Sequence, residues 1–141
     1  ICLKMNGIKI IALKKIKTPK GDIYKFLSKK DKYFKKFGEI YFSEIKKKQK
    51  KGWNYHVKNK CHISIIAGKV KFHFLKKKGK FYTSKKIILS AKNYKMLIVQ
   101  PQIYFSFLGL GSFNLIVNFL ENAHSLKESK KFKVVNKIAI K

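Results

Sequence analysis

The stretch "KVKFHFL", residues 69–75, alternates between polar and large apolar side chains. Successive side chains of a β-strand point to opposite faces of the sheet, so a period of two predicts a strand with one buried face. The apolar parity, expected to face inward, holds Val70, Phe72 and Phe74, and the polar parity, expected to face outward, holds Lys69, Lys71 and His73. This segment therefore favours a half-buried sheet over a helix.

The same period recurs on both sides of this segment. In "EIYFSEI", residues 39–45, Ile40 and Phe42 share one face, while Tyr41 and Ser43 share the other. Glycine-containing turn signals at 18–22, 76–80 and 109–114 divide the chain into short segments. The strand candidates are 8–16, 23–27, 39–46, 61–67, 69–75, 81–89, 95–99, 103–108, 113–120 and 132–140. Short strands at this spacing predict an all-β sandwich or barrel, with one short helix around residues 28–36.

Composition limits the possible functions. The chain has 141 residues, of which 45% are hydrophobic, enough for one globular domain spanning 1–141. Its 35 basic residues against 6 acidic ones give a net charge of +29, which suggests a polyanion partner. Every basic residue is lysine, however, whereas proteins that read nucleic acid favour the bidentate fork of arginine. We therefore regard nucleic acid as an unlikely partner.

Cysteine usage and hydropathy bear on the compartment. Cys2 and Cys61 lie far apart without a metal-type spacing, which fits a reducing cytoplasm. Residues 96–120 carry no charge, but Pro101 and the glycines at 109 and 111 interrupt them. Their aromatic and β-branched content favours buried strands over a membrane helix, so no membrane association is expected.

Several motifs in fixed order resemble one family. They are "FGEIYFSEI" (37–45), "KGWNYH" (51–56), "GKVKFHF" (68–74) and the spaced set Asn118, His124 and Glu128. Together with the segments around them they resemble the short, cupin-type sugar-nucleotide epimerases related to dTDP-4-dehydrorhamnose 3,5-epimerase. The resemblance covers roughly residues 7 to 135. It implies an all-β, cupin-type jelly-roll β-barrel, a homodimer, a dTDP-hexose as substrate, and no cofactor.

The family's chemistry can be compared with the residues present. Epimerisation beside a ketone needs a base to remove the α-proton, a donor for the enolate oxygen, and an acid on the opposite face. The resemblance places Lys51 at the family's arginine, Asn54 at its histidine base and Asn118 at its tyrosine acid. Asparagine does not titrate near neutral pH and cannot act as a base. The expected catalytic groups are therefore His56 as base and Tyr104, or a water molecule, as acid.

Each candidate also has a simpler interpretation. His56 shares a face with Asn54 and could instead hydrogen-bond a substrate hydroxyl or a neighbouring strand. Trp53 and Tyr55 point to the opposite face, where packing is their default role. The expected substrate-binding residues are Lys51, Asn54, His62, Gln102, Asn118, His124 and Glu128. A cupin metal centre needs several histidines and a glutamate, and only one of these ligands is in place, so no metal is expected.

Three functional classes remain open from sequence alone. The first is an epimerase or 3,4-ketoisomerase acting on a dTDP-4-keto-6-deoxyhexose. The second is a non-catalytic sugar-nucleotide binder, which the two asparagines favour. The third is a polyanion binder, which only the net charge favours.

Overall fold

The computed structural model describes residues 5–125, 127 and 129–131, and these residues form strands, turns and loops without a helix. The strands are β1 (Ile8–Ala12), β2 (Lys15–Ile16), β3 (Ile23–Tyr24), β4 (Glu39–Glu44), β5 (Lys50–His56), β6 (Cys61–Ala67), β7 (Lys69–Lys78), β8 (Phe81–Ser90), β9 (Lys95–Val99), β10 (Tyr104–Gly109), β11 (Leu115–Leu120) and β12 (Ser129–Lys131). The predicted all-β class is confirmed. In this part of the chain no helix has the length and apolar character to cross a membrane.

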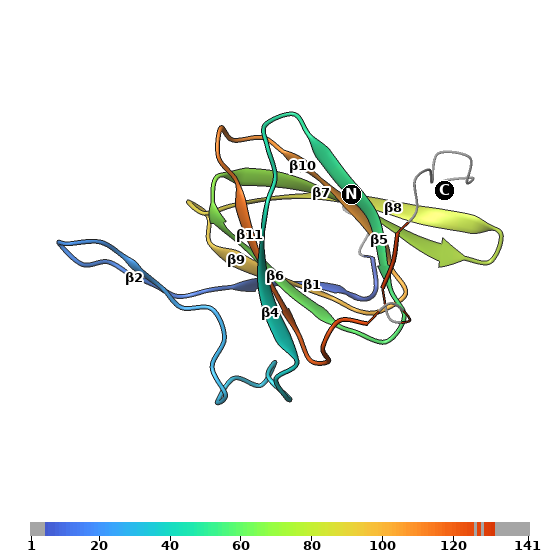
Figure 1. The fold of residues 1–141 in the computed structure, drawn as a ribbon, viewed down its shortest axis with the longest axis horizontal. Coiled ribbons are helices and arrows are strands. Elements are labelled where there is room, and N and C mark those ends of the chain that lie inside the picture. The colour runs from blue at the N-terminus through green and yellow to red at the C-terminus, as the bar shows by residue number, and fades with distance from the viewer. Residues whose placement is uncertain (1–4, 126, 128, 132–141) are drawn as a thin grey trace.

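Two five-stranded sheets face each other (Figure 1). The first has the order β1-β9-β6-β11-β4, and the second has the order β12-β5-β10-β7-β8. Neighbouring strands within each sheet pair antiparallel. Non-consecutive strands are therefore neighbours, and the chain repeatedly crosses from one sheet to the other.

The apolar faces of the two sheets meet in one core. Phe72 and Phe74 on β7, which were predicted to face inward, are almost completely buried, and so is Val70. Ile63 on β6 and Phe105 on β10 belong to the same cluster. The alternation that predicted β7 thus also identified its buried face.

Three sequence predictions need correction. Residues 28–36 form turns rather than the expected helix, and Phe34 from this loop packs against Phe119 with ring centroids 5.8 Å apart. β5 was not among the predicted strands. His73 was expected to be exposed but is half-buried beside Trp53, and its Nε2 bonds Ser84 Oγ at 2.7 Å. The strand predicted at 132–140 lies outside the described residues.

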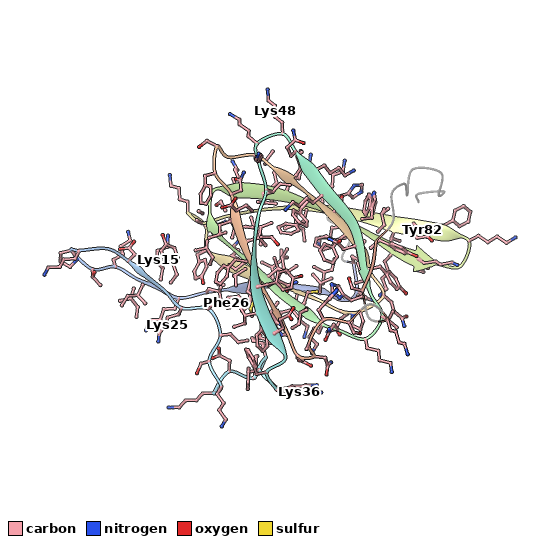
Figure 2. The ribbon with its side chains drawn as sticks, viewed as in Figure 1. Lys15, Lys25, Phe26, Lys36, Lys48 and Tyr82 are labelled. Atoms are coloured by element: carbon pink, nitrogen blue, oxygen red, sulfur yellow. The ribbon has the colours of Figure 1, made fainter. Side chains whose placement is uncertain are left out.

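Most of the lysines lie away from the space between the sheets. Figure 2 shows Lys36 and Lys48 at the periphery, and Lys15 and Lys25 on the hairpin formed by β2 and β3. This hairpin projects from the body of the molecule (blue in Figure 1) and pairs with neither large sheet.

Candidate functional site

A cavity of about 560 Å³ lies between the two sheets. Its floor is apolar and is made by Ile63, Phe72, Phe105, Phe107 and Ile116. Its polar lining consists of Glu39, Tyr41, Ser43, Lys51, Asn54, His56, Asn118, His124 and Ser129. A concave space of this volume that combines an apolar floor with convergent polar groups is typical of a small-molecule site.

The polar face of β4 points into the cavity. Glu39, Tyr41 and Ser43 occupy every second position of the strand and all line it. The apolar face of the same strand is turned outward, with Ile40 45% exposed and Phe42 61% exposed. Sequence reasoning separated these two faces but did not identify Glu39, Tyr41 or Ser43 as site residues. Their polar spacing of two was the signal that could have found them.

An irregularity in β5 brings Lys51 onto the cavity face. Asn54 and His56 share a parity, whereas Lys51 has the opposite parity and would point away in a regular strand. The register between β10 and β5 shifts between Phe105 and Phe107, so that Phe105 pairs with Asn54 and Phe107 pairs with Lys51. Such a shift rotates the side chains on either side of it relative to each other, and all three polar residues line the cavity.

His56 is the most enclosed ionisable group of the cavity lining. It is 5% exposed, and its ring stacks on Phe105 with centroids 6.2 Å apart and an interplanar angle of 17°. Its backbone carbonyl accepts a 2.8 Å hydrogen bond from the Gln102 amide. The imidazole is therefore held by packing, which limits the orientations it can adopt toward a ligand.

Tyr41 and Asn118 form a hydrogen-bonded pair across β4 and β11. These residues are direct cross-strand partners, and Asn118 Nδ2 donates to the Tyr41 phenol oxygen at 2.8 Å. Tyr41 keeps 37% of its surface exposed, yet burial of its phenol raises the pKa above the usual value of 10.0. The hydrogen bond from Asn118 opposes that increase in pKa. Tyr41 is therefore protonated at neutral pH.

The cavity contains few of the chain's positive charges. Among the described residues that line it, Lys51 is the one lysine, and its Nζ donates to the Glu44 carbonyl oxygen at 2.6 Å. Glu39 contributes a carboxylate to the same lining. Among the described residues, the lining thus carries one lysine and one glutamate, which suits one small ligand better than a long polyanion.

His62 is not in this cavity. Its side chain is fully buried on the other face of the first sheet, where Nδ1 donates to the Phe119 carbonyl oxygen at 3.2 Å. Burial lowers its pKa below 6.5, so that the ring is neutral at pH 7. It lines a separate pocket of about 320 Å³ beside Tyr33 and several lysines.

Tyr104 and Gln102 also lie away from the cavity. They line a pocket on the outer side of the second sheet, together with Tyr55. The ring of Tyr104 packs on Tyr55 with centroids 4.7 Å apart, and it lies 5.9 Å from the ring of Tyr82. Because Phe105 faces the core, its neighbour Tyr104 must face outward. The structure therefore does not bring the expected acid to the expected base.

The remaining predicted residues divide between the cavity and positions outside it. Trp53 packs in a small outer cluster with Leu75 and Tyr82, in agreement with the packing role expected for it. His124 lines the cavity from the segment after β11. Glu128 lies outside the described residues. The described chain contains no group of three or more histidine, cysteine, aspartate or glutamate side chains arranged to hold a metal ion.

No protein-family model matches the sequence, and no curated protein matches it either. Solved structures do resemble it. A dTDP sugar isomerase from Desulfovibrio desulfuricans G20 superposes with a TM-score of 0.90 at 23% identity, over 98% of this chain and 91% of that protein. A dTDP-6-deoxy-D-glucose-3,5-epimerase from Legionella pneumophila, in complex with dTDP-4-keto-L-rhamnose, gives 0.82 at 18% identity, over 97% and 78%.

A sugar 3,4-ketoisomerase from Thermoanaerobacterium thermosaccharolyticum, in complex with TDP, gives a TM-score of 0.78 at 15% identity, over 92% of this chain and 91% of that protein. These similarities extend over nearly the whole chain, although the identities are low. A shared fold can carry different reactions, so the similarity bears on architecture first. The protein has the fold of the dTDP-sugar epimerases and isomerases.

Proposed function

We propose that this protein is an isomerase acting on a dTDP-4-keto-6-deoxyhexose bound in the cavity between the sheets. The observation that carries the proposal is the convergence of His56, Tyr41 and Lys51 on one cavity between the sheets. The fold similarity to epimerases and isomerases of dTDP-sugars supports the same substrate class.

The ketone at C4 acidifies the hydrogens on the adjacent carbons, and the cavity provides a group to remove one. His56 is a suitable base because an imidazole accepts a proton near neutral pH. As the C–H bond breaks, its electron pair forms a C=C bond to C4 and the carbonyl π-electrons move to the oxygen. The resulting enolate needs a positive partner, and Lys51 is the lysine among the described residues of the lining.

Asn54 fits a binding role. It stands two residues before His56 on the same face of β5 and lines the cavity, but its amide cannot take up a proton. A carboxamide offers one acceptor and two donor hydrogens to sugar hydroxyls. This substitution at the expected base position also favours a second candidate, a sugar-nucleotide binder without catalytic activity.

Solvent exchange separates these two candidates. The protein is incubated in D₂O with dTDP-4-keto-6-deoxyglucose, and the C3 and C5 proton signals are followed by NMR. We expect the wild-type protein to replace at least one of them, and His56→Gln to slow this by about 100-fold or more. Glu39 also lines the cavity, and its carboxylate is the alternative base. The Glu39→Gln variant should exchange these protons at about the wild-type rate. Tight dTDP binding without exchange would identify the binder instead.

We further propose a homodimer. The outer face of β4 exposes Ile40 and Phe42 beside the exposed Phe37, and the projecting hairpin exposes Ile23 and Tyr24. Exposed apolar side chains of this kind commonly mark protein contacts. Sedimentation velocity should give the dimer mass for the wild-type protein and the monomer mass for a Phe42→Lys variant. A monomeric wild type over the micromolar range would contradict this assignment.

A further inference from the structure

The cavity lining includes a phenol that comes from the other sheet than His56. His56 lies on β5 in the second sheet, whereas Tyr41 lies on β4 in the first. Both side chains line the same cavity. A flat sugar enolate held between the sheets would therefore have the imidazole toward one face and the phenol toward the other.

The hydrogen bond to Asn118 prepares the phenol to give up its proton. Since Asn118 Nδ2 donates to the Tyr41 oxygen, the phenolic hydrogen is not used in this contact. The same N–H stabilises the tyrosinate that remains after proton transfer. Asn118 Oδ1 is buried without a hydrogen-bond partner among the described residues, so an acceptor remains beside the phenol.

The resemblance to the epimerase family placed an asparagine where an acid tyrosine would stand. In the structure that asparagine, Asn118, is the cross-strand partner of Tyr41. A phenol hydroxyl is thus present within 2.8 Å of the Asn118 amide, but it comes from the neighbouring strand β4. A phenol can therefore still serve as the acid, although the residue on β11 is Asn118 and not a tyrosine.

We infer that Tyr41 is the proton donor of this site, that Asn118 positions it, and that the reaction inverts the configuration at the carbon beside the ketone. This rests on the proposed function. His56 removes the proton from one face, and Tyr41 O–H delivers a proton to the same carbon from the other face, while the enolate electrons return to that carbon and the C4 carbonyl re-forms. His56 then carries the added proton and Tyr41 is a tyrosinate, and exchange with water restores both.

A ketoisomerase requires a different geometry. Moving a proton between neighbouring carbons and oxygens on one face of the sugar can use a single base, without a donor on the opposite face. Two groups on facing walls are instead the arrangement that inversion needs. The placement of Tyr41 and His56 therefore selects epimerisation from the two isomerase reactions considered for this chain.

The test separates proton removal from inversion. Tyr41→Phe is incubated with dTDP-4-keto-6-deoxyglucose in D₂O, and NMR follows both loss of the C3 and C5 protons and appearance of the inverted sugar. We expect exchange within about threefold of wild type but inversion slowed by about 100-fold or more, because the base is intact and the acid is missing. Tyr82→Phe, which removes a hydroxyl from the outer cluster, should leave both rates unchanged.

Two more variants complete the test. Tyr104→Phe, at the position that the sequence suggested for the acid, should invert at the wild-type rate. Asn118→Leu should slow inversion more than exchange, and this provides a second reading if Tyr41→Phe does not fold. Inversion at the wild-type rate by folded Tyr41→Phe, or loss of inversion in Tyr104→Phe, would overturn the assignment and leave the proposed function standing. A wild-type protein that exchanges no proton would overturn both.

Discussion

A Cβ atom on Gly52 would lie 2.8 Å from the carbonyl oxygen of Phe105 and 2.9 Å from Ser106 Cα. Gly52 also has a φ of +116°, a conformation that L side chains rarely adopt. It lies in β5 next to Lys51, where the register shift turns the lysine into the cavity. The shape of the candidate site thus depends on one position without a side chain.

We predict that Gly52→Ala lowers the free energy of unfolding by more than about 2 kcal/mol, through backbone strain and contact with β10 together. The matched control is Gly79→Ala, where φ is +62° and an added Cβ meets nothing within 4 Å. That variant should lose only about 1 kcal/mol. Urea unfolding measures the free energy of unfolding of both variants. An equal decrease in the two would show that the close approach of Gly52 to Phe105 is unimportant.

Asn114 organises the turn before β11. Its Oδ1 accepts from the Lys69 and Gly111 amides, and its Nδ2 donates to the Ile45 and Gly111 carbonyls, at 2.8–3.0 Å. Replacing it with alanine leaves several of these backbone groups without that partner. We expect Asn114→Ala to cost about 2–4 kcal/mol in urea unfolding. Asn93→Ala, at an exposed turn, should cost less than about 0.5 kcal/mol.

His62 gives the fold an acid-sensitive element. Burial lowers its pKa in the folded protein, so the unfolded chain takes up the proton first as pH falls below about 6.5. The stability that neutral, buried His62 contributes is fully present above that pH. It is lost as the pH falls through the lowered pKa of His62 in the folded protein. Wild-type stability should therefore decrease between pH 7.5 and 5, and His62→Gln should decrease less steeply. An unchanged slope in the variant would show that His62 does not contribute.

Salt dependence distinguishes a small-ligand site from a polyanion surface. With one lysine among the described residues of the cavity lining, we expect the Kd for dTDP to rise less than about tenfold between 50 and 500 mM NaCl. Binding to a 20-nucleotide single strand through the surface lysines should weaken far more over the same range, since each phosphate contact adds to the salt slope. Calorimetry measures the first and fluorescence anisotropy the second. A steep salt slope for dTDP would favour the polyanion interpretation.

How much the sequence could predict depended on how regular each strand is. "KVKFHFL" alternates up to Phe74, and its strand and the buried face with Val70, Phe72 and Phe74 were predicted correctly, although Leu75 on the other face is buried as well. "KKGWNYH" was recognised for its motif but not as a strand. Its lysines and glycine hide the period of two, and the register shift at Gly52 breaks it. The segment 28–36 was expected to form a helix, but it forms turns, and its Phe34 packs on Phe119 of β11.

Of the residues that line the candidate cavity, the sequence pointed to several from its motifs, but not to those on the polar face of β4. Lys51, Asn54 and His56 came from one motif, and the structure brings them together. Tyr41 was not named as a site residue, although it lies on the polar face of β4, and its pairing with Asn118 across strands cannot be derived from one segment alone. Tyr104 was chosen for its hydroxyl, whereas the inward direction of Phe105 decides that it faces outward.

The position of a bound nucleotide tests the central claim most directly. A crystal structure of the protein soaked with dTDP should show the ligand in the cavity between the sheets, with its terminal phosphate directed toward the space that His56, Tyr41 and Lys51 line. Density for dTDP in the pocket beside His62 or in the pocket beside Tyr104, with the cavity between the sheets empty, would contradict the account.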